Sequence, residues 1–281
     1  CDGGSGYGYG HIRRSYTLAR ALESEDFSVK YTVLSKTNFF LKNEFAPTET
    51  DPVIQVLDLP YEIQPWVDRA NEKDIPTIAL DYFDDARPTL TISIYEHRNP
   101  PPGGRRLAGL DYAIIRPEIL RLAPAAIGNG IVVIIGGSDI NQVGGCCASR
   151  LTEAGKEVYL IQGPGNTEGY PSDLPNVTVL HDPDDLGSLM ATCEWAVTNG
   201  GGSMMEMMSL GKAVHVVPQT NDELRLAEIV FNRGGLLGIG LDSLRVPSIE
   251  EIKKVGKRAR KLVDGQGVHR IVDLISSFSS G

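Results

Sequence analysis

The chain is poor in cysteine, and its four cysteines are badly spaced for a shared site. None forms a CxxC pair, and the adjacent Cys146 and Cys147 would point in different directions on a helix. Metal-ligand spacing of histidines and cysteines is also lacking. These absences argue against a disulfide scaffold and a zinc site, and they favour a reducing, cytoplasmic environment.

Long apolar runs and an excess of positive charge are lacking too. No apolar run reaches the roughly 18 residues that a membrane-spanning helix needs. The 281 residues carry a formal net charge of −9, which argues against an extended nucleic-acid-binding face but allows a small basic pocket around a phosphate. Neither a Gly-Lys-Ser/Thr phosphate loop nor a GxSxG nucleophile elbow occurs. The composition leaves the oligomeric state undefined.

The sequence does contain an alternation of strand-like apolar runs with helical segments, which predicts parallel-sheet α/β units. In the first half we expect strands near 28–35, 53–57, 77–81, 91–95 and 112–115, with helices over 11–24, 37–45 and 62–73. In the second half we expect strands over 130–135, 158–162, 177–180, 195–198 and 213–217, with helices over 140–154, 185–192, 203–210, 221–233, 248–263 and 268–277. At about 150 residues per domain, the length favours two domains.

Prolines and glycines cluster near 117–129 and mark the boundary between the two halves. We assign residues 1–122 to an N-terminal Rossmann-like domain and 123–281 to a C-terminal one. Packing of the last helix back on the N-terminal domain stays open. The chain opens directly in a glycine-rich loop, so the first strand that a Rossmann-like half needs is either absent from this sequence or misplaced by this interpretation.

The clearest local signal is the segment 198–206, which reads TNGGGSMME and follows the apolar run 195–197. Backbone N–H groups at Gly201 and Gly202, together with the positive end of the helix dipole, could hold a phosphate. The alternative is purely structural, with Ser203 as N-cap and Glu206 completing a capping box three residues later. The pattern alone leaves both interpretations open.

A second glycine-rich loop ends in Gly10 and His11, at the predicted start of a helix. The partial positive charge at that end disfavours imidazolium, and a neutral imidazole is what a general base requires. The alternative is a surface histidine that is hydrogen-bonded locally. Because ordering a loop so rich in glycine costs entropy, we favour a functional role for His11.

Polar residues follow three further strands. Gly137 and Ser138 could bind a pyrophosphate oxygen or simply form a capped turn. Asp84 could bind sugar hydroxyls, although a local Asx turn explains it more readily. Asp222 and Glu223 would cap the helix that follows them and face the same edge of the sheet as the loop before Ser203.

Five segments occur in order along the chain: 8–14, 79–85, 112–116, 134–139 and 199–206, which read GYGHIRR, ALDYFDD, YAIIR, IIGGSD and NGGGSMME. Together they resemble the PseG/SpsG group of nucleotide-sugar hydrolases, which is related in fold to MurG-type glycosyltransferases. The resemblance implies a GT-B-like α/β fold, with two Rossmann-like domains and an interdomain cleft for a small-molecule UDP-sugar. It implies no metal and no organic cofactor, with UDP only as part of substrate and product.

The resemblance also implies roles for individual residues. Gly201, Gly202 and Ser203 would contact the diphosphate, Glu206 would take the ribose hydroxyls, and His11 would activate water. The implied reaction is hydrolysis of a UDP-linked amino-deoxy sugar at its anomeric carbon, which releases UDP and the free sugar for a surface glycan of the pseudaminic-acid type.

One departure from the family pattern and two alternative functions qualify this interpretation. Relatives commonly carry Asn-Gln where this chain has Asp222 and Glu223, so the sugar is undefined; these two residues, with Gly10, Tyr61 and Asp84, are the sugar-side candidates. One alternative function is a GT-B glycosyltransferase, in which the same base deprotonates an acceptor hydroxyl and the loop 100–106 contributes the acceptor face. Another is a non-catalytic protein that binds a nucleotide sugar.

Overall fold

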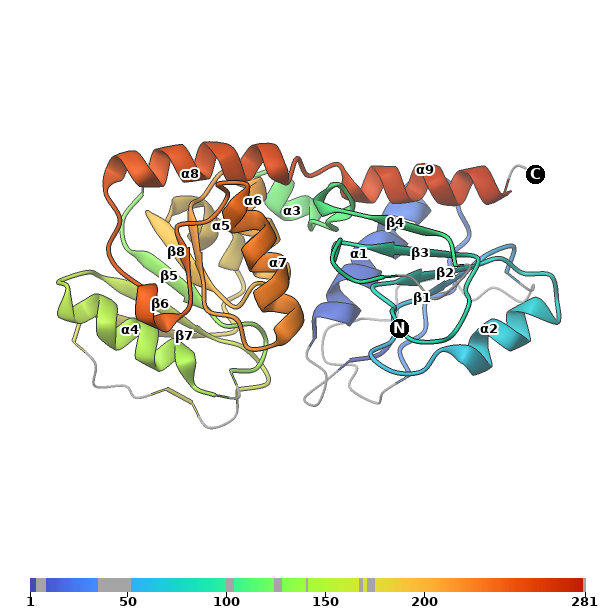
Figure 1. Ribbon diagram of the computed structural model, residues 1–281, viewed down its shortest axis with the longest axis horizontal. Coiled ribbons are helices and arrows are strands. Elements are labelled where there is room, and N and C mark those ends of the chain that lie inside the picture. Colours follow the sequence, from blue (N-terminus) through green and yellow to red (C-terminus); the bar gives the residue numbers. More distant parts are fainter. Residues whose placement is uncertain are drawn as a thin grey trace. The chain divides into compact units, whose positions relative to one another are not determined.

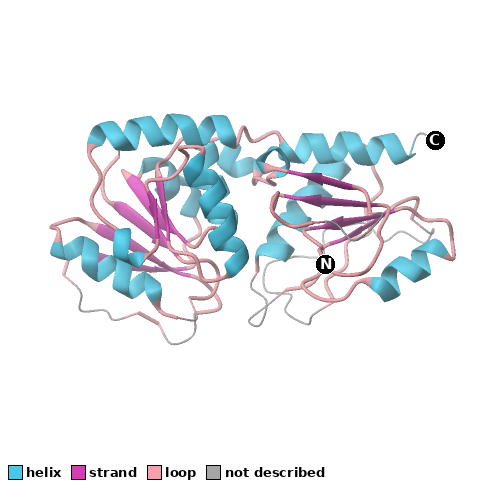
Figure 2. Cartoon of the chain, in the orientation of Figure 1, coloured by secondary structure: helices cyan, strands magenta, loops and turns pink. Residues whose placement is uncertain are grey.

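The computed structural model describes residues 1–3, 9–34, 52–99, 104–123, 128–139, 141–166, 169–170 and 175–279. The chain divides into two compact units, each built on its own parallel sheet (Figures 1 and 2). Unit 1 comprises residues 1–114 and 265–281, and unit 2 comprises residues 115–264. The division differs from the predicted one at residue 122, because the short helix α3 (Pro117–Leu120) belongs to unit 2 and the last helix belongs to unit 1.

Unit 1 contains a four-stranded parallel sheet in the order β1-β2-β3-β4. Its elements are β1 (Gln55–Leu57), β2 (Thr77–Leu80), β3 (Leu90–Ser93), β4 (Arg106–Ala108), α1 (Gly10–Ser24), α2 (Gln64–Asn71), the 3-10 helix η1 (Leu110–Tyr112) and α9 (Gly267–Ser279). Every residue of β2 and β3 is buried, as in a sheet covered on both faces. Leu18 and Leu22 of α1 pack in one core with Ile78, Ile271 and Ile275.

The first residues of the chain lie against the end of this sheet. The Cys1 backbone nitrogen donates to the Thr32 carbonyl (2.9 Å), and the Leu34 N–H donates to the Cys1 carbonyl (3.0 Å), which is the pattern of a parallel bridge. The Asp2 N–H donates to the carbonyl of Asp58, just beyond β1 (3.2 Å). The expected strand at 28–35 is therefore reduced to this bridge in residues 28–34, and the helix expected at 37–45 lies outside the described residues.

Unit 2 contains a six-stranded parallel sheet in the order β10-β9-β8-β5-β6-β7, the classical dinucleotide-fold order. Its strands are β5 (Ile131–Ile134), β6 (Val158–Gln162), β7 (Val177–His181), β8 (Trp195–Thr198), β9 (Val214–Val216) and β10 (Gly238–Ile239). Its other helices are α4 (Val143–Glu153), α5 (Leu186–Thr192), α6 (Gly202–Ser209), α7 (Asn221–Asn232), the 3-10 helix η2 (Leu241–Ser243) and α8 (Ile249–Leu262). The order reverses between β5 and β8, so the loops after these strands begin side by side.

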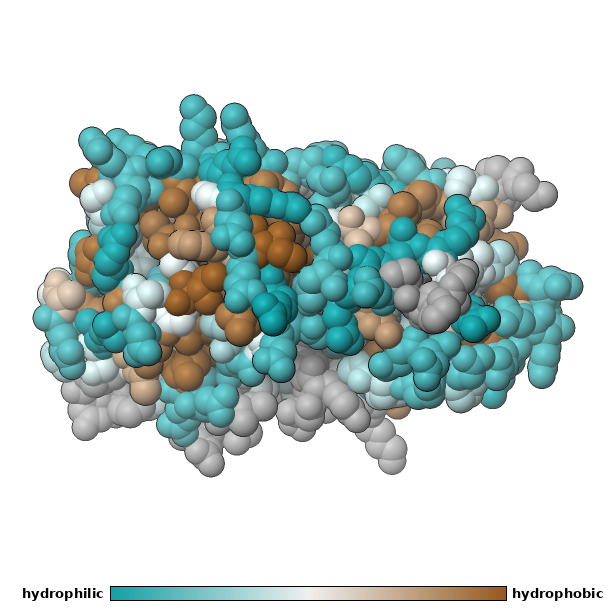
Figure 3. All heavy atoms as spheres, in the orientation of Figure 1, coloured by the Kyte–Doolittle hydropathy of each residue, from teal (hydrophilic) through white to brown (hydrophobic). Residues whose placement is uncertain are grey.

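Helix α8 is amphipathic, with Ile252, Gly256 and Ala259 buried. Hydrophilic residues cover its outer surface in Figure 3. A capping box closes its start, where Ser248 accepts from the Glu251 N–H and Glu251 accepts from the Ser248 N–H. Within the described part of the chain, no helix is long and apolar enough to cross a membrane.

Gly256 and Gly145 form a matched pair of helical glycines. A Cβ at Gly256 would lie 2.2 Å from the Gly211 carbonyl oxygen, whereas a Cβ at Gly145 would lie 3.7 Å from the Tyr170 ring. We expect Gly256→Ala to destabilise the protein by about 1–3 kcal/mol, because backbone must move. Gly145→Ala should stabilise it by about 0.5–1 kcal/mol, because alanine favours a helix. Melting temperatures test both, and a stabilised Gly256→Ala protein would contradict this packing.

Candidate functional site

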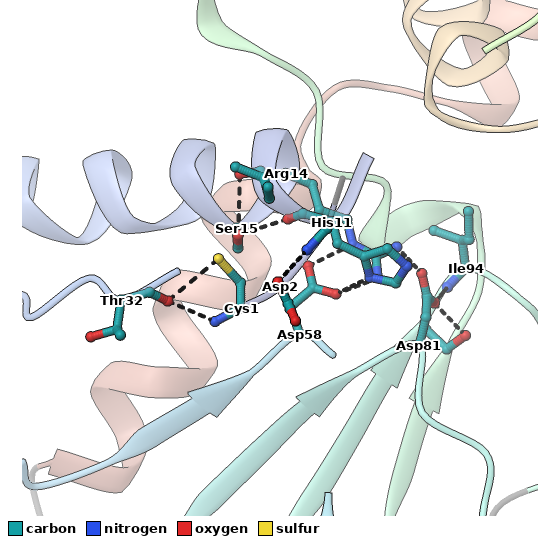
Figure 4. Close-up of polar contacts among 12 residues, drawn as sticks. Cys1, Asp2, His11, Arg14, Ser15, Thr32, Asp58, Asp81 and Ile94 are labelled. Carbon is teal, nitrogen blue, oxygen red and sulfur yellow. Dashed lines mark hydrogen bonds and ion pairs between the residues drawn. The ribbon is translucent and has the colours of Figure 1, made fainter. Parts of the chain in front are cut away.

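His11 lies in the first turn of α1, and its ring points at the carboxylate of Asp58 (Figure 4). The Nδ1 atom is 2.6 Å from Oδ1 of Asp58, which is 1% exposed, whereas the His11 side chain is 24% exposed. A carboxylate at Nδ1 favours the tautomer with the proton on that nitrogen. Nε2 is then left as the basic atom, which is the arrangement that a general base needs.

The Asp58 carboxylate is shared with Arg14, one turn after His11. Arg14 donates from Nε to Oδ2 (2.8 Å) and from Nη2 to Oδ1 (2.7 Å), a bidentate pair. Burial alone would raise the pKa of Asp58, but Arg14 and the His11 hydrogen bond outweigh it and hold that pKa at about 2. Asp58 is therefore an anion at neutral pH, fixed beneath the imidazole.

The guanidinium of Arg14 also pairs with the carboxylate of Asp81, which lies at the end of another strand. Arg14 donates from Nη1 to Asp81, which follows β2 as Asp58 follows β1. Asp81 also accepts from Ser93 Oγ (2.7 Å) and from the Ile94 N–H (3.1 Å). The sequence predicts Asp84 and Tyr61 as candidates instead of these two acids. Only the pairing of neighbouring strands brings Asp58 and Asp81 to one guanidinium.

The other first-half candidates do not join this cluster through the hydrogen bonds described. The Tyr61 hydroxyl donates to Asp2 (2.7 Å), and its ring packs near Trp66. Asp84 is exposed beyond the end of β2. Gly10 is the first residue of α1, and a Cβ there would meet none of the described residues within 4 Å.

In unit 2 the loop after β8 leads directly into α6, whose N-cap is Gly201. No side chain of the described residues caps this helix, so the predicted capping box of Ser203 and Glu206 is wrong. A Cβ at Gly202 would meet no atom of the described part of the chain within 4 Å, and Gly202 is exposed. An uncapped, accessible helix start with glycines is suited to an anion, because its N–H groups lack helical partners.

Glu206 turns away from that helix start and pairs with Arg116, the N-cap residue of α3. The guanidinium donates from Nε to Oε1 (2.6 Å) and from Nη2 to Oε2 (2.9 Å). Burial would lower the pKa of Arg116, but pairing with Glu206 raises it instead. Arg116 lies 90 positions from Glu206, so no local sequence pattern could have indicated this pair.

Glu223 is a structural acid. One oxygen accepts from Asn199 Nδ2 (2.5 Å), and the other accepts from the Gln219 N–H (2.7 Å) and closes a capping box with Thr220. Burial raises the pKa of Glu223 despite these hydrogen bonds. The carboxylate braces the glycine loop after β8 through Asn199, and a sugar contact by Glu223 stays a prediction. Asp222 lies beside it, half-buried in the first turn of α7.

The loop after β5 packs against a glycine pair that sequence reasoning missed. The Gly165 N–H donates to the Gly137 carbonyl (2.8 Å), and a Cβ on Gly165 would lie 2.1 Å from Ser138 Oγ. Neither Gly137 nor Ser138 caps α4, which begins only at Val143. The GPG sequence at 163–165 was the available signal, because two glycines after a strand indicate close backbone approach.

Among the residues described, no three His, Cys, Asp or Glu side chains are grouped to hold a metal ion.

Comparison with known proteins gives the fold a class. The structure of MurG from Acinetobacter baumannii matches with a TM-score of 0.66 and 14% identity over 98% of both chains. The S. aureus MnaA–UDP structure matches with a TM-score of 0.62 and 11% identity, over 97% of this chain and 95% of that one. The chain therefore has the GT-B glycosyltransferase-like fold, with two Rossmann-like domains, as predicted.

The sequence comparison is narrower. A curated relative from Leifsonia xyli subsp. xyli is 31% identical over 185 residues, which are 59% of this chain and 51% of that protein. It is named UDP-N-acetylglucosamine--N-acetylmuramyl-(pentapeptide) pyrophosphoryl-undecaprenol N-acetylglucosamine transferase. This chain thus spans about half the length of the relative that it matches. No protein-family model matches the chain.

The buried Asp58 carboxylate should make stability depend on pH. A pKa lowered from 3.8 to about 2 stabilises the fold above the unfolded-state value, and this contribution is lost as pH falls through the folded value. The shift corresponds to about 2 kcal/mol, of which roughly half is lost by pH 3. We expect Asp58→Asn to be less stable at pH 7 and to lose less stability than the parent between pH 5 and pH 3.

Glu251 is the matched control. Its pKa is also about 2, because Arg245 and the Ser248 N–H stabilise the carboxylate, but Glu251 is solvent-exposed and its pair is screened. Urea unfolding of the parent, Asp58→Asn and Glu251→Gln at each pH compares the three. Equal pH slopes for the parent and Asp58→Asn would show that the buried carboxylate contributes nothing in this range.

Proposed function

We propose that the chain is a glycosyltransferase that transfers a sugar from a UDP-sugar to an acceptor hydroxyl, with His11 as the general base. The observation that carries the proposal is the pairing of His11 Nδ1 with the buried Asp58 carboxylate at 2.6 Å, which leaves Nε2 basic. The named activity of the Leifsonia xyli relative supports transfer rather than hydrolysis. The GT-B fold supports a nucleotide-sugar donor.

Unit 2 supplies the donor-binding part of this proposal. The N–H groups of Gly202 and Ser203 at the start of α6 would receive the diphosphate, and the loop at Gly137 and Ser138 adjoins it across β5 and β8. Glu206 would accept hydrogen bonds from the ribose. A carboxylate has about four lone-pair sites, so its bidentate pair with Arg116 leaves acceptor capacity for a diol.

The reaction requires one proton acceptor and a stabilised leaving group. The acceptor oxygen forms a bond to the anomeric carbon, the bond from that carbon to the β-phosphate oxygen breaks, and the hydroxyl proton passes to His11 Nε2. Negative charge develops on UDP, where the helix dipole and the loop N–H groups of α6 stabilise it. Hydrolysis differs only in that water replaces the acceptor hydroxyl, and it is the competing outcome.

A UDP-release assay separates the candidate functions. We expect release from a panel of UDP-sugars to depend on an added hydroxyl acceptor, and His11→Ala to lower kcat by about 10²–10⁴-fold with a small change in KM. Arg20→Gln, an exposed site on the same helix, is the control variant. Release at the same rate without acceptor would identify a hydrolase, and UDP binding without any turnover would identify a binding protein.

The ribose contact has its own test. If Glu206 accepts from the 2′-hydroxyl, UDP should bind the parent protein more tightly than 2′-deoxy-UDP, by roughly tenfold, and Glu206→Gln should reduce that ratio. Glu118→Gln is the matched control, because Glu118 is an exposed partner of the same Arg116 (3.3 Å). Calorimetric Kd values decide the matter: an unchanged ratio in Glu206→Gln would exclude a ribose contact.

A further inference from the structure

Arg14 is placed between two carboxylates beside the proposed base (Figure 4). It binds both oxygens of Asp58 with Nε and Nη2, and it reaches Asp81 with Nη1. Its Nη2 atom also lies 3.1 Å from His11 Nδ1. Because His11 and Arg14 are three residues apart on α1, both side chains leave the same face of the helix. The guanidinium is therefore an immediate neighbour of the imidazole.

The backbone at Asp81 is held in an unusual conformation. Its φ angle is +48°, in the left-handed region that residues other than glycine, asparagine and aspartate rarely adopt. The hydrogen bonds from Ser93 and Ile94 hold one carboxylate oxygen, and Arg14 takes the other. A sparsely populated backbone conformation persists when its surroundings determine it, and it is common at functional sites.

The charges of the cluster do not cancel while the imidazole is neutral. One guanidinium faces two carboxylates, so the net charge is −1 with neutral His11 and zero with imidazolium. Other ionisable groups also face it: Asp2 near Asp58, Tyr31 on the same side, and Tyr95 near Arg14. Replacing Arg14 or Asp81 by a neutral residue should therefore change the proton affinity of His11.

We propose that Arg14 and Asp81 are positioning residues that set the protonation of His11. The positive charge of Arg14 offsets the negative charge of Asp58 at the imidazole, and the negative charge of Asp81 offsets part of the positive charge of Arg14. The proposal deepens the general-base role of His11 and rests on it. Arg14 also fixes both oxygens of Asp58, so the carboxylate that orients the imidazole cannot rotate freely. Neither residue needs to touch substrate.

Two substitutions test the proposal in opposite directions. Arg14→Gln removes a positive charge and should favour imidazolium, so the acidic limb of the kcat/KM profile should move up by about 1–2 pH units. Asp81→Asn removes a negative charge and should move that limb down. Asparagine tolerates the left-handed backbone and can still accept from Ser93, so this variant is compatible with the fold.

A second readout does not depend on activity. The His11 imidazole is titrated by ¹⁵N NMR and assigned by comparison with His11→Ala, and its midpoint should move with the same signs in the two variants. Arg14→Lys keeps the positive charge but loses the bidentate hydrogen bonds to Asp58. It should restore most of the parental midpoint of His11. Arg20→Gln on the exposed side of α1 should leave the midpoint unchanged.

The outcomes are distinct. A purely structural role would lower activity equally at all pH values and leave the His11 midpoint in place, which would overturn the proposal, as would shifts of the same sign in both variants. If Arg14→Gln does not fold, the direction of the Asp81→Asn shift decides alone. If the parent turns over no UDP-sugar but the midpoints shift as expected, the proposed function fails while the coupling of Arg14 and Asp81 to His11 stands.

Discussion

The arrangement of unit 1 around His11 depends on one buried charge, the carboxylate of Asp58. Removing an anion from water is costly unless cations and hydrogen bonds replace the solvent. Arg14 supplies two hydrogen bonds and His11 a third, so the carboxylate is stable as an anion in its buried position. The same compensation that makes Asp58 tolerable also orients the imidazole. Stability and positioning of the base therefore have a single physical cause.

In unit 2 the loops after β5 and β8 are rich in glycine, so they expose backbone groups rather than side chains. Such loops have little side-chain packing to define them, so neighbouring groups must hold them. Glu223 holds the loop after β8 through Asn199, and Gly165 holds the loop after β5 by direct backbone contact. Glu223 thus holds the shape of the loop, and no described side chain caps the start of α6.

The sequence predicts the architecture better than the site. The five strands expected in the second half are all present. The apolar runs of β5, β8 and β9 are wholly buried, as in a sheet covered on both faces, whereas β7 at the sheet edge is only partly buried. Very short elements are missed: β4 has three residues after a proline-rich loop, β10 has two, and the strand expected at 112–115 is replaced by η1 and extended chain. The glycine-rich loop before His11 is enough to predict it as a candidate site residue. The pairing of Asp58 and Asp81 with Arg14 depends on the order of the strands, which no local sequence pattern contains.

The capping boxes show why local patterns succeed at some positions only. A serine or threonine followed three residues later by glutamate closes α7 and α8, where the glutamates find their nearest donors in their own helices. The same spacing at Ser203 and Glu206 does not close α6, because this helix starts at Gly202 with Gly201 as its N-cap; Ser203 lies within the first turn, and Glu206 pairs with Arg116. The first turn of α6 therefore contains no acidic residue. A carboxylate at a helix start would repel a diphosphate, so its absence from this turn is compatible with the proposed donor site.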